Sequence, residues 1–305
     1  MRSSSLFMGT LFGLLLAGGG SFSLAADAPA SAPPAKPVLL LRMKPLEELI
    51  ADMRFLGSEL GREQEGKQLE ELLKAQTGPN GLEGVDARKP FGLFATVKPS
   101  LTQSEIVLLL PVADEKSFLA FLEKINFKPE KEADGVYNLQ VENVPVPLMF
   151  RFSQGYLYGM AKLNEKMVLP PKDKIPDIAK LLGSGSGILS LTMNVDQLPP
   201  QVRKVAVSSS ALLLGELKEK ELPNATAKQK AVWEAILDEA SRLAKSMLED
   251  ATRMELQFDL DRKARDVSLA LSLEGKPDST LARNIAGLAP ATSVSAGLES
   301  RSAVM

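Results

Sequence analysis

Residues 81–112 read GLEGVDARKPFGLFATVKPSLTQSEIVLLLPV and hold the clearest paired-strand pattern of the chain. Its two apolar runs, residues 91–97 and 106–112, are long enough for strands and too short for membrane-spanning helices. Gly81 and Gly84 precede the first run and predict a turn there. We therefore expect an antiparallel hairpin at the centre of the fold, and nothing in this stretch indicates catalysis.

The elements around this hairpin are predicted twice in the same order. Residues 38–125 and residues 188–288 both show a strand, a proline-started helix, a helix, two strands and a helix. We therefore predict an α+β fold of two tandem related units, each a mainly antiparallel sheet packed against helices, at residues 38–169 and 187–290. Residues 170–186, rich in proline and glycine, are predicted to link them.

Two observations leave the repeat open. Residue identity between the copies is low, and the glycine turn at residues 81–86 has no clear counterpart before Arg253, so a coincidence of patterns is the alternative. Residues 291–305 resemble the start of another strand and helix, which predicts a truncated relative of a longer protein. A chain that assembles only with further copies of its unit would have uncovered strand edges or an apolar patch near residues 293–305.

Local signals define several elements. Asp114 is predicted to cap a helix whose apolar face carries Phe118 and Leu122. The segment from Ile178 to Leu182 is predicted as a short helix. Further predictions are a hairpin of residues 148–152 and 156–160, a helix near residues 198–207, a long helix from about Thr226 to Asp250, and paired strands at residues 253–260 and 267–273.

The N-terminal residues predict export. Arg2, an apolar run at residues 6–16 and small residues ending at Ala26 match a cleaved secretory signal over residues 1–26, with an uncleaved anchor as the alternative. Residues 27–37 are rich in alanine and proline, which predicts a disordered linker. The apolar run of the signal is too short to span a bilayer, and no second stretch long enough to span one follows it. We therefore expect a periplasmic or secreted protein without a transmembrane segment after signal cleavage.

Composition argues against several kinds of function. The 305 residues include no cysteine and no histidine, which removes thiol chemistry, the Ser-His-Asp triad and most zinc or iron sites. The formal net charge of -2 gives no bias toward nucleic acid, so no nucleic-acid partner is predicted. Asp259 and Asp261 form a D-x-D pair without the other EF-hand positions. We predict no catalytic residue, no cofactor and no metal ligand.

Three stretches carry a resemblance to a known family. They are the turn at residues 81–86 with Pro90, the segment LLPVADEKSFLAFL at residues 109–122, and FRFSQGYLYG at residues 150–159. Together with the signal peptide, they resemble a family of uncharacterised exported proteins common in planctomycete bacteria. The resemblance covers most of the chain and implies export and repetition. It brings no known activity and no functional residues.

One local bias suggests a binding site. All three tyrosines lie in a strand-rich segment, and Tyr156, Tyr158, Phe150 and Phe152 are candidate ligand-binding residues because aromatic rings on an exposed sheet face bind peptides, glycans or apolar molecules. Tyr156 and Tyr158 share a face by their period of two. Cross-strand packing in the core is the alternative explanation for all four rings.

We therefore expect an exported, non-enzymatic α+β protein with a binding or structural role outside the cytoplasm. Its partner would be an unknown protein, a glycan or a small apolar ligand. The competing hypothesis is a carboxylate-dependent hydrolase of the periplasm or cell surface, which requires two acidic side chains converging in a pocket, with a raised pKa. Adjacent acidic pairs such as Glu47-Glu48 and Asp238-Glu239 are predicted as solvated helix faces.

Overall fold

The structure is a computed structural model that describes residues 36–62, 64, 71, 83–140, 146–183, 187–219 and 226–288. The predicted signal peptide, most of the linker at residues 27–37, the second helix of the first predicted unit and the segment 291–305 lie outside the described residues. By its internal contacts the chain divides into two compact units. The first holds the described residues up to Pro199 together with Glu255–Leu271, and the second holds Pro200–Met254 and the residues from Ser272 onward.

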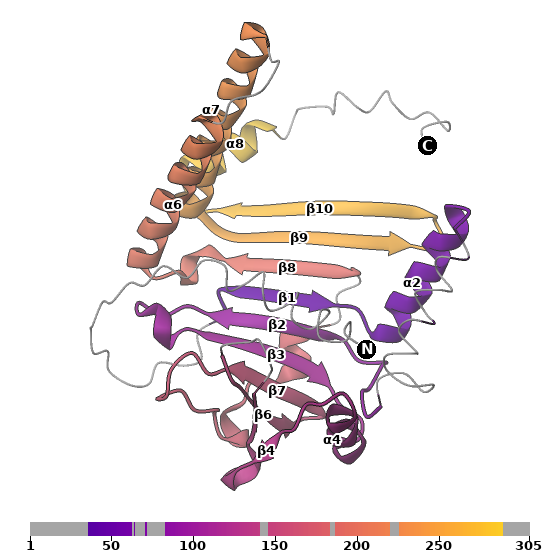
Figure 1. Cartoon of the computed structure of the whole chain (residues 1–305). Coiled ribbons are helices and arrows are strands. Elements are labelled where there is room, and N and C mark those ends of the chain that lie inside the picture. The colour runs from indigo at the N-terminus through magenta and orange to yellow at the C-terminus, as the bar shows by residue number, and fades with distance from the viewer. Residues whose placement is uncertain are drawn as a thin grey trace. The chain divides into compact units, whose positions relative to one another are not determined.

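Ten strands of the described residues form one sheet, which confirms the α+β class. Their order across the sheet is β10-β9-β8-β1-β2-β3-β7-β6-β5-β4, and neighbouring strands run antiparallel where their register is defined (Figure 1). The strands are β1 (Leu39–Met43), β2 (Phe91–Thr96), β3 (Glu105–Pro111), β4 (Glu130–Lys131), β5 (Tyr137–Leu139), β6 (Leu148–Ser153), β7 (Tyr156–Ala161), β8 (Leu189–Asn194), β9 (Ala251–Asp261) and β10 (Asp266–Gly275).

The α-helices fall into two groups. Helices α2 (Leu46–Glu59), α4 (Glu115–Lys124) and α5 (Ile178–Leu182) belong to the first unit. Helices α6 (Pro200–Glu219), α7 (Ala227–Asp250) and α8 (Thr280–Leu288) belong to the second. Helix α6 is longer than the sequence predicted, whereas α7 matches its predicted bounds within one residue.

The predicted central hairpin is confirmed. Strands β2 and β3 pair in a register that sets Leu93 opposite Leu108, and the odd-numbered side chains Val107 and Leu109 of β3 are fully buried. The turn before β2 closes against the end of β3, because Gly84 adopts a φ of 82° and its carbonyl accepts hydrogen bonds from the N–H groups of residues 113 and 114. The first unit is thus built outward from this pair of strands.

Opposite faces of the sheet carry separate cores. On one face, Val107, Leu109 and Tyr158 pack with Ile178 and Leu182 of α5. On the other face, Phe118 and Leu122 of α4 pack with the side chains of residues 150, 152 and 157. Asp114 caps α4 as predicted, since its Oδ1 accepts a hydrogen bond of 2.6 Å from the Ser117 N–H.

Residues 170–183 are part of the first core, so the prediction of a linker over residues 170–186 is wrong for its described part. Ile175, Ile178 and Leu182 are all buried in the same cluster as Leu109. Ile178 and Leu182 are four residues apart and share one face of α5, and the extended Ile175 joins them in the core. The prolines that precede α5 lie within the first unit and do not mark a domain boundary.

The second unit contains a helical hairpin. Helices α6 and α7 pack against each other, and Lys218 pairs with Asp238 at 2.9 Å between them. Helix α7 begins with a capping box, in which Thr226 and Gln229 exchange side-chain to backbone hydrogen bonds of 3.3 and 2.8 Å. Of the helices in the described residues, none combines the length and apolar character needed to cross a membrane.

The compact units do not coincide with the two predicted tandem segments. Residues 187–199 and 255–271 group with the first unit, although the tandem prediction assigns both stretches to the second copy. Helix α7 also runs directly into β9 at Ala251, so the second half has no equivalent of the turn around Gly84. The tandem repeat therefore stays a prediction.

Candidate functional site

The four aromatic residues predicted to bind a ligand lie in the cores. Tyr156 and Tyr158 expose only 4% and 3% of their surface, and they share one face of β7 as their spacing predicts. Phe150 and Phe152 are equally buried in the cluster on the other face of the sheet. The structure therefore separates the four rings into two pairs, and the exposed aromatic face that the binding hypothesis requires is not formed by them.

Neighbouring side chains cover these rings. Tyr158 meets Phe94 edge to face with ring centroids 6.2 Å apart, and Phe150 stacks on Tyr137 at 5.1 Å. Burial raises the pKa values of the Tyr156 and Tyr158 phenols. This is the cross-strand packing that the sequence offered as the alternative, so we place no ligand site here.

An ion cluster around the buried Asp52, which the sequence analysis missed, joins α2 to the β9–β10 hairpin. Lys44 Nζ lies 3.4 Å from Asp52 Oδ2 and 3.1 Å from Asp259 Oδ1. Arg262 Nε lies 3.1 Å from Asp52 Oδ1, although the contact lacks hydrogen-bond geometry. The cluster thus connects residues more than 200 positions apart in the chain and holds the hairpin turn against α2.

One signal in the sequence pointed to this cluster. Asp52 follows Leu49 by three residues and precedes Leu56 by four, so it lies on the apolar face of α2, where a charge requires a buried partner. Asp52 exposes only 2% of its surface. A substrate cannot reach that carboxylate, and Lys44 is shared between Asp52 and Asp259, so the cluster compensates charge and does not suit acid catalysis.

Two other carboxylates, Asp114 and Asp261, also lack the raised pKa that the hydrolase hypothesis requires. Hydrogen bonds from Ser117 lower the pKa of Asp114, and backbone hydrogen bonds from Ala264 and Lys263 lower the pKa of Asp261. A general acid needs a shift in the other direction. In the described residues, no group of three or more acidic side chains is arranged to hold a metal ion.

The basic turn between β9 and β10 is largely neutralised. Arg262 contacts Asp52, and Arg265 Nη2 lies 3.5 Å from Glu59 Oε1. Two of the three cations of this turn are therefore engaged with acidic residues of α2. The arrangement gives no positive surface of the kind that binds a phosphate backbone.

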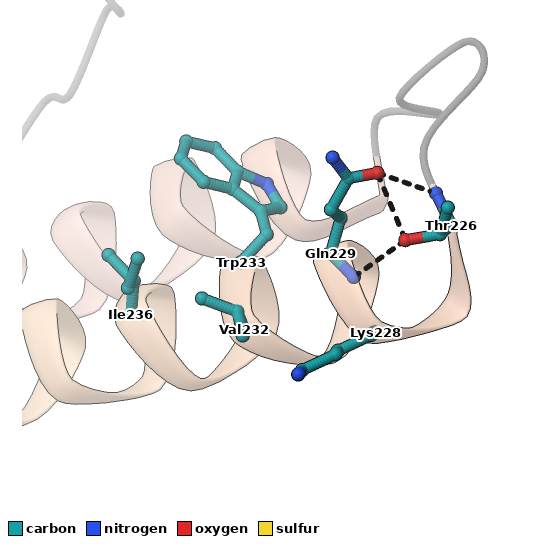
Figure 2. Close-up of a pocket in the computed structure, with 6 residues that line it drawn as sticks. All are labelled: Thr226, Lys228, Gln229, Val232, Trp233 and Ile236. Carbon is teal, nitrogen blue, oxygen red and sulfur yellow. Dashed lines mark hydrogen bonds between the residues drawn. The ribbon is translucent and has the colours of Figure 1, made fainter.

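The second unit has a shallow depression on α7 (Figure 2). Thr226, Lys228, Gln229, Val232, Trp233 and Ile236 line a volume of about 420 Å³. All six residues come from the first eleven positions of one capped helix, and the depression is open to solvent. One helix cannot surround a small molecule, so this depression does not have the form of a ligand pocket.

Among the described residues, the surface best suited to binding is the outer edge of β10, the terminal strand of the sheet that they form (Figure 1). Its residues from Asp266 to Ser272 are all exposed. Val267, Leu269 and Leu271 expose 51%, 70% and 58% of their surface, and their alternation places them on one face of the strand. We call residues 266–275 with this apolar face the β10 edge.

The opposite end of the sheet is protected in the way that natural edge strands usually are. There, β4 has two residues, Glu130 and Lys131, and both are charged and exposed. In contrast, β10 has ten residues, and the seven from Val267 to Leu273 include no charge and no proline. Short length, charge and proline are the features that prevent edge pairing. β10 is not short, and its charges, Asp266 and Glu274, lie only near its two ends.

Comparisons with family models, with curated proteins and with solved structures gave no match to this chain. The resemblance to exported planctomycete proteins therefore stays a prediction from residues 81–86, 109–122 and 150–159.

Proposed function

We propose that this chain is an exported, non-enzymatic binding protein that acts outside the cytoplasm and recognises a β-strand through the β10 edge. The observation that carries the proposal is the exposure of β10 at one end of the ten-stranded sheet of the described residues. This strand has ten residues, and its central residues carry no charge. A strand in this position presents unpaired N–H and C=O groups, which form main-chain hydrogen bonds with an added strand. The apolar side chains on one face add contact area.

The order of strands supports this proposal. Strands β1, β2 and β3 follow one another on one side of the β1–β8 pairing, and β8, β9 and β10 follow one another on the other side. We propose that these halves are related copies, as the repeated order of elements predicts. In that relation β10 corresponds to β3, whose outer edge is covered by the antiparallel strand β7. At β10, no strand of the described residues occupies the position that corresponds to β7.

Export and the lack of enzymatic activity rest on the sequence. The apolar run at residues 6–16 and the small residues up to Ala26 have the form of a secretory signal. The chain also lacks histidine and cysteine, the residues most often used as general base and thiol nucleophile. In the cluster around Lys44, Asp52 is buried and both carboxylates are charge-compensated, so this cluster does not favour the hydrolase alternative.

A strand-binding function can be tested with a synthetic peptide of residues 266–275 as a generic strand probe. The full exported chain should bind the fluorescently labelled peptide saturably in an anisotropy titration. Leu269→Lys places a charge on the β10 edge and should weaken binding at least about tenfold, because a charged edge resists strand addition. A chain that shows no saturable binding would contradict the proposed function.

The matched control for this titration is Leu60→Lys. Leu60 exposes 62% of its surface, close to the 70% of Leu269, and follows the last residue of α2. The preceding Glu59 contacts Arg265 of the β9–β10 turn, so Leu60→Lys adds the same charge near β10 but outside the strand itself. The control should bind the peptide like the wild type. Equal weakening by both substitutions would show a general effect of added charge and would also contradict the proposal.

A further inference from the structure

We propose that the strand bound by the β10 edge is β10 of a second copy of this chain, which would give a twofold dimer with one continuous antiparallel sheet. This inference rests on the proposed strand-binding function and adds the identity of the partner. An isologous contact requires a surface that is complementary to itself. The β10 edge meets this requirement in its apolar pattern and in its charges.

The apolar pattern of β10 allows self-pairing. Val267, Leu269 and Leu271 lie on one face, and the small residues Ser268 and Ala270 lie on the other. Residues directly opposite each other in an antiparallel pair share a face of the sheet. Registers that set odd positions opposite odd positions therefore bring the exposed leucines of the two copies together and form one apolar strip across the dimer.

Charge selects one register among these. With Leu271 opposite Leu271 of the partner subunit, Asp266 lies opposite Lys276 of the partner subunit, and the twofold axis repeats this pair. Lys276 directly follows β10, and its Nζ donates a hydrogen bond to the Glu249 carbonyl, which leaves its positive charge uncompensated. A register centred on Ala270 instead sets Asp266 opposite Glu274 of the partner subunit. Like charges directly opposite each other disfavour that register, and opposite charges favour the first.

Two further properties favour a second copy over another protein. The net charge of -2 on 305 residues gives little electrostatic repulsion between copies. The same chain already contains an antiparallel pairing between strands distant in sequence, β1 with β8, with Leu41 opposite Leu191. Pairing of β10 with its copy would extend the sheet in the same antiparallel manner and would cover both exposed edges at once.

Sedimentation equilibrium of the full exported chain tests the dimer. We expect a concentration-dependent monomer–dimer equilibrium for the wild type and for Leu60→Lys, and loss of the dimer for Leu269→Lys. A wild-type chain that stays monomeric at every concentration would overturn the inference. If that monomer still binds the peptide of residues 266–275, the strand-binding function stands and only the choice of partner fails.

Cysteine substitution tests the register, because the natural chain has no cysteine and each introduced thiol is the only one present. Opposed residues in an antiparallel pair have Cα atoms about 4.5 to 5.5 Å apart, within the range of a disulfide. Under oxidation Leu271→Cys should give a covalent dimer. Leu269→Cys should not, since the two thiols would be offset by four residues, about 13 Å.

Leu60→Cys is the control for random collision, because Leu60 is as exposed as Leu271. It should remain monomeric under the same oxidation. Efficient cross-linking of Leu60→Cys or Leu269→Cys, or cross-linking of Ala270→Cys in preference to Leu271→Cys, would overturn the proposed register.

Discussion

A Gly84→Ala variant should lose about 3 kcal/mol or more of its free energy of unfolding. Gly84 has a φ of 82°, a region that costs an L-residue roughly 1 to 2 kcal/mol. A Cβ atom at this position would lie 2.3 Å from the Phe118 backbone nitrogen and 2.7 Å from the Asp114 carbonyl oxygen. Both contacts are with backbone atoms, so relief requires a shift of α4, and overpacking of this kind costs roughly 1 to 3 kcal/mol more.

The hydrogen bonds around Gly84 prevent an easy adjustment. Its carbonyl oxygen accepts from Ala113 N–H at 2.8 Å and from Asp114 N–H at 3.2 Å, which fixes the turn against the start of α4. Urea unfolding followed by circular dichroism gives the loss directly. Gly61→Ala is the matched control, because Gly61 has a φ of 66° with no atom within 4 Å of the added Cβ.

The Gly61→Ala variant should lose only the backbone term, roughly 1 kcal/mol. Equal losses for the two alanine variants would contradict the close packing of the Gly84 turn on α4. A near-neutral Gly84→Ala variant would contradict the structure of the hairpin entry itself.

An Asp52→Ala variant should be destabilised by about 2 to 3 kcal/mol. Removing one member of a buried ion pair costs roughly 3 to 5 kcal/mol, since the remaining charge stays desolvated. We expect the lower part of this range or slightly less, because the Arg262 side chain is 45% exposed and can return to water. Lys44, at 11% exposure, keeps Asp259 as a partner.

Glu59→Ala is the control for the ion cluster. Glu59 pairs with Arg265 of the same hairpin turn at 3.5 Å, but the two side chains are 36% and 71% exposed. Exposed pairs contribute roughly 0 to 1 kcal/mol, so this variant should unfold nearly like the wild type in the same urea titration. If Asp52→Ala were also near neutral, the cluster would not hold the β9–β10 hairpin against α2.

Short-range signals in the sequence predicted the elements well. The two apolar runs after the Gly84 turn predicted β2 and β3, and the structure has both strands. Asp114 caps α4 and Thr226 caps α7, each at the helix start that the sequence predicted. Each of these depends on residues a few positions apart, so the sequence pattern contains the physical cause. The α+β class follows from the number and length of such elements.

Features that depend on distant residues were not predictable in this way. The period-two spacing of Tyr156 and Tyr158 placed them on one face correctly, but their burial depends on residues 167–182, which cover that face. Residues 170–186, which overlap this stretch, were predicted as a linker because their prolines and glycines were given more weight than Ile178 and Leu182. Asp52 acquires its role from Asp259 and Arg262, which lie far along the chain.

The β10 edge combines one feature that depends on nearby residues with one that depends on distant residues. A strand was predicted at residues 267–273, and β10 contains all of these residues. Its position at the end of the sheet depends on the order of all ten strands, which no local pattern encodes. The expectation of uncovered edges or an apolar patch near residues 293–305 concerns a segment outside the described residues, so it stays a prediction.

Amide hydrogen exchange of residues 266–275 as a function of protein concentration tests the proposed binding surface most directly. If β10 pairs with a second copy, its outward N–H groups should exchange rapidly in dilute solution and become protected as the concentration rises. The fully buried β7, Tyr156–Ala161, should be protected equally at all concentrations. Exchange at β10 that does not change with concentration would contradict the account.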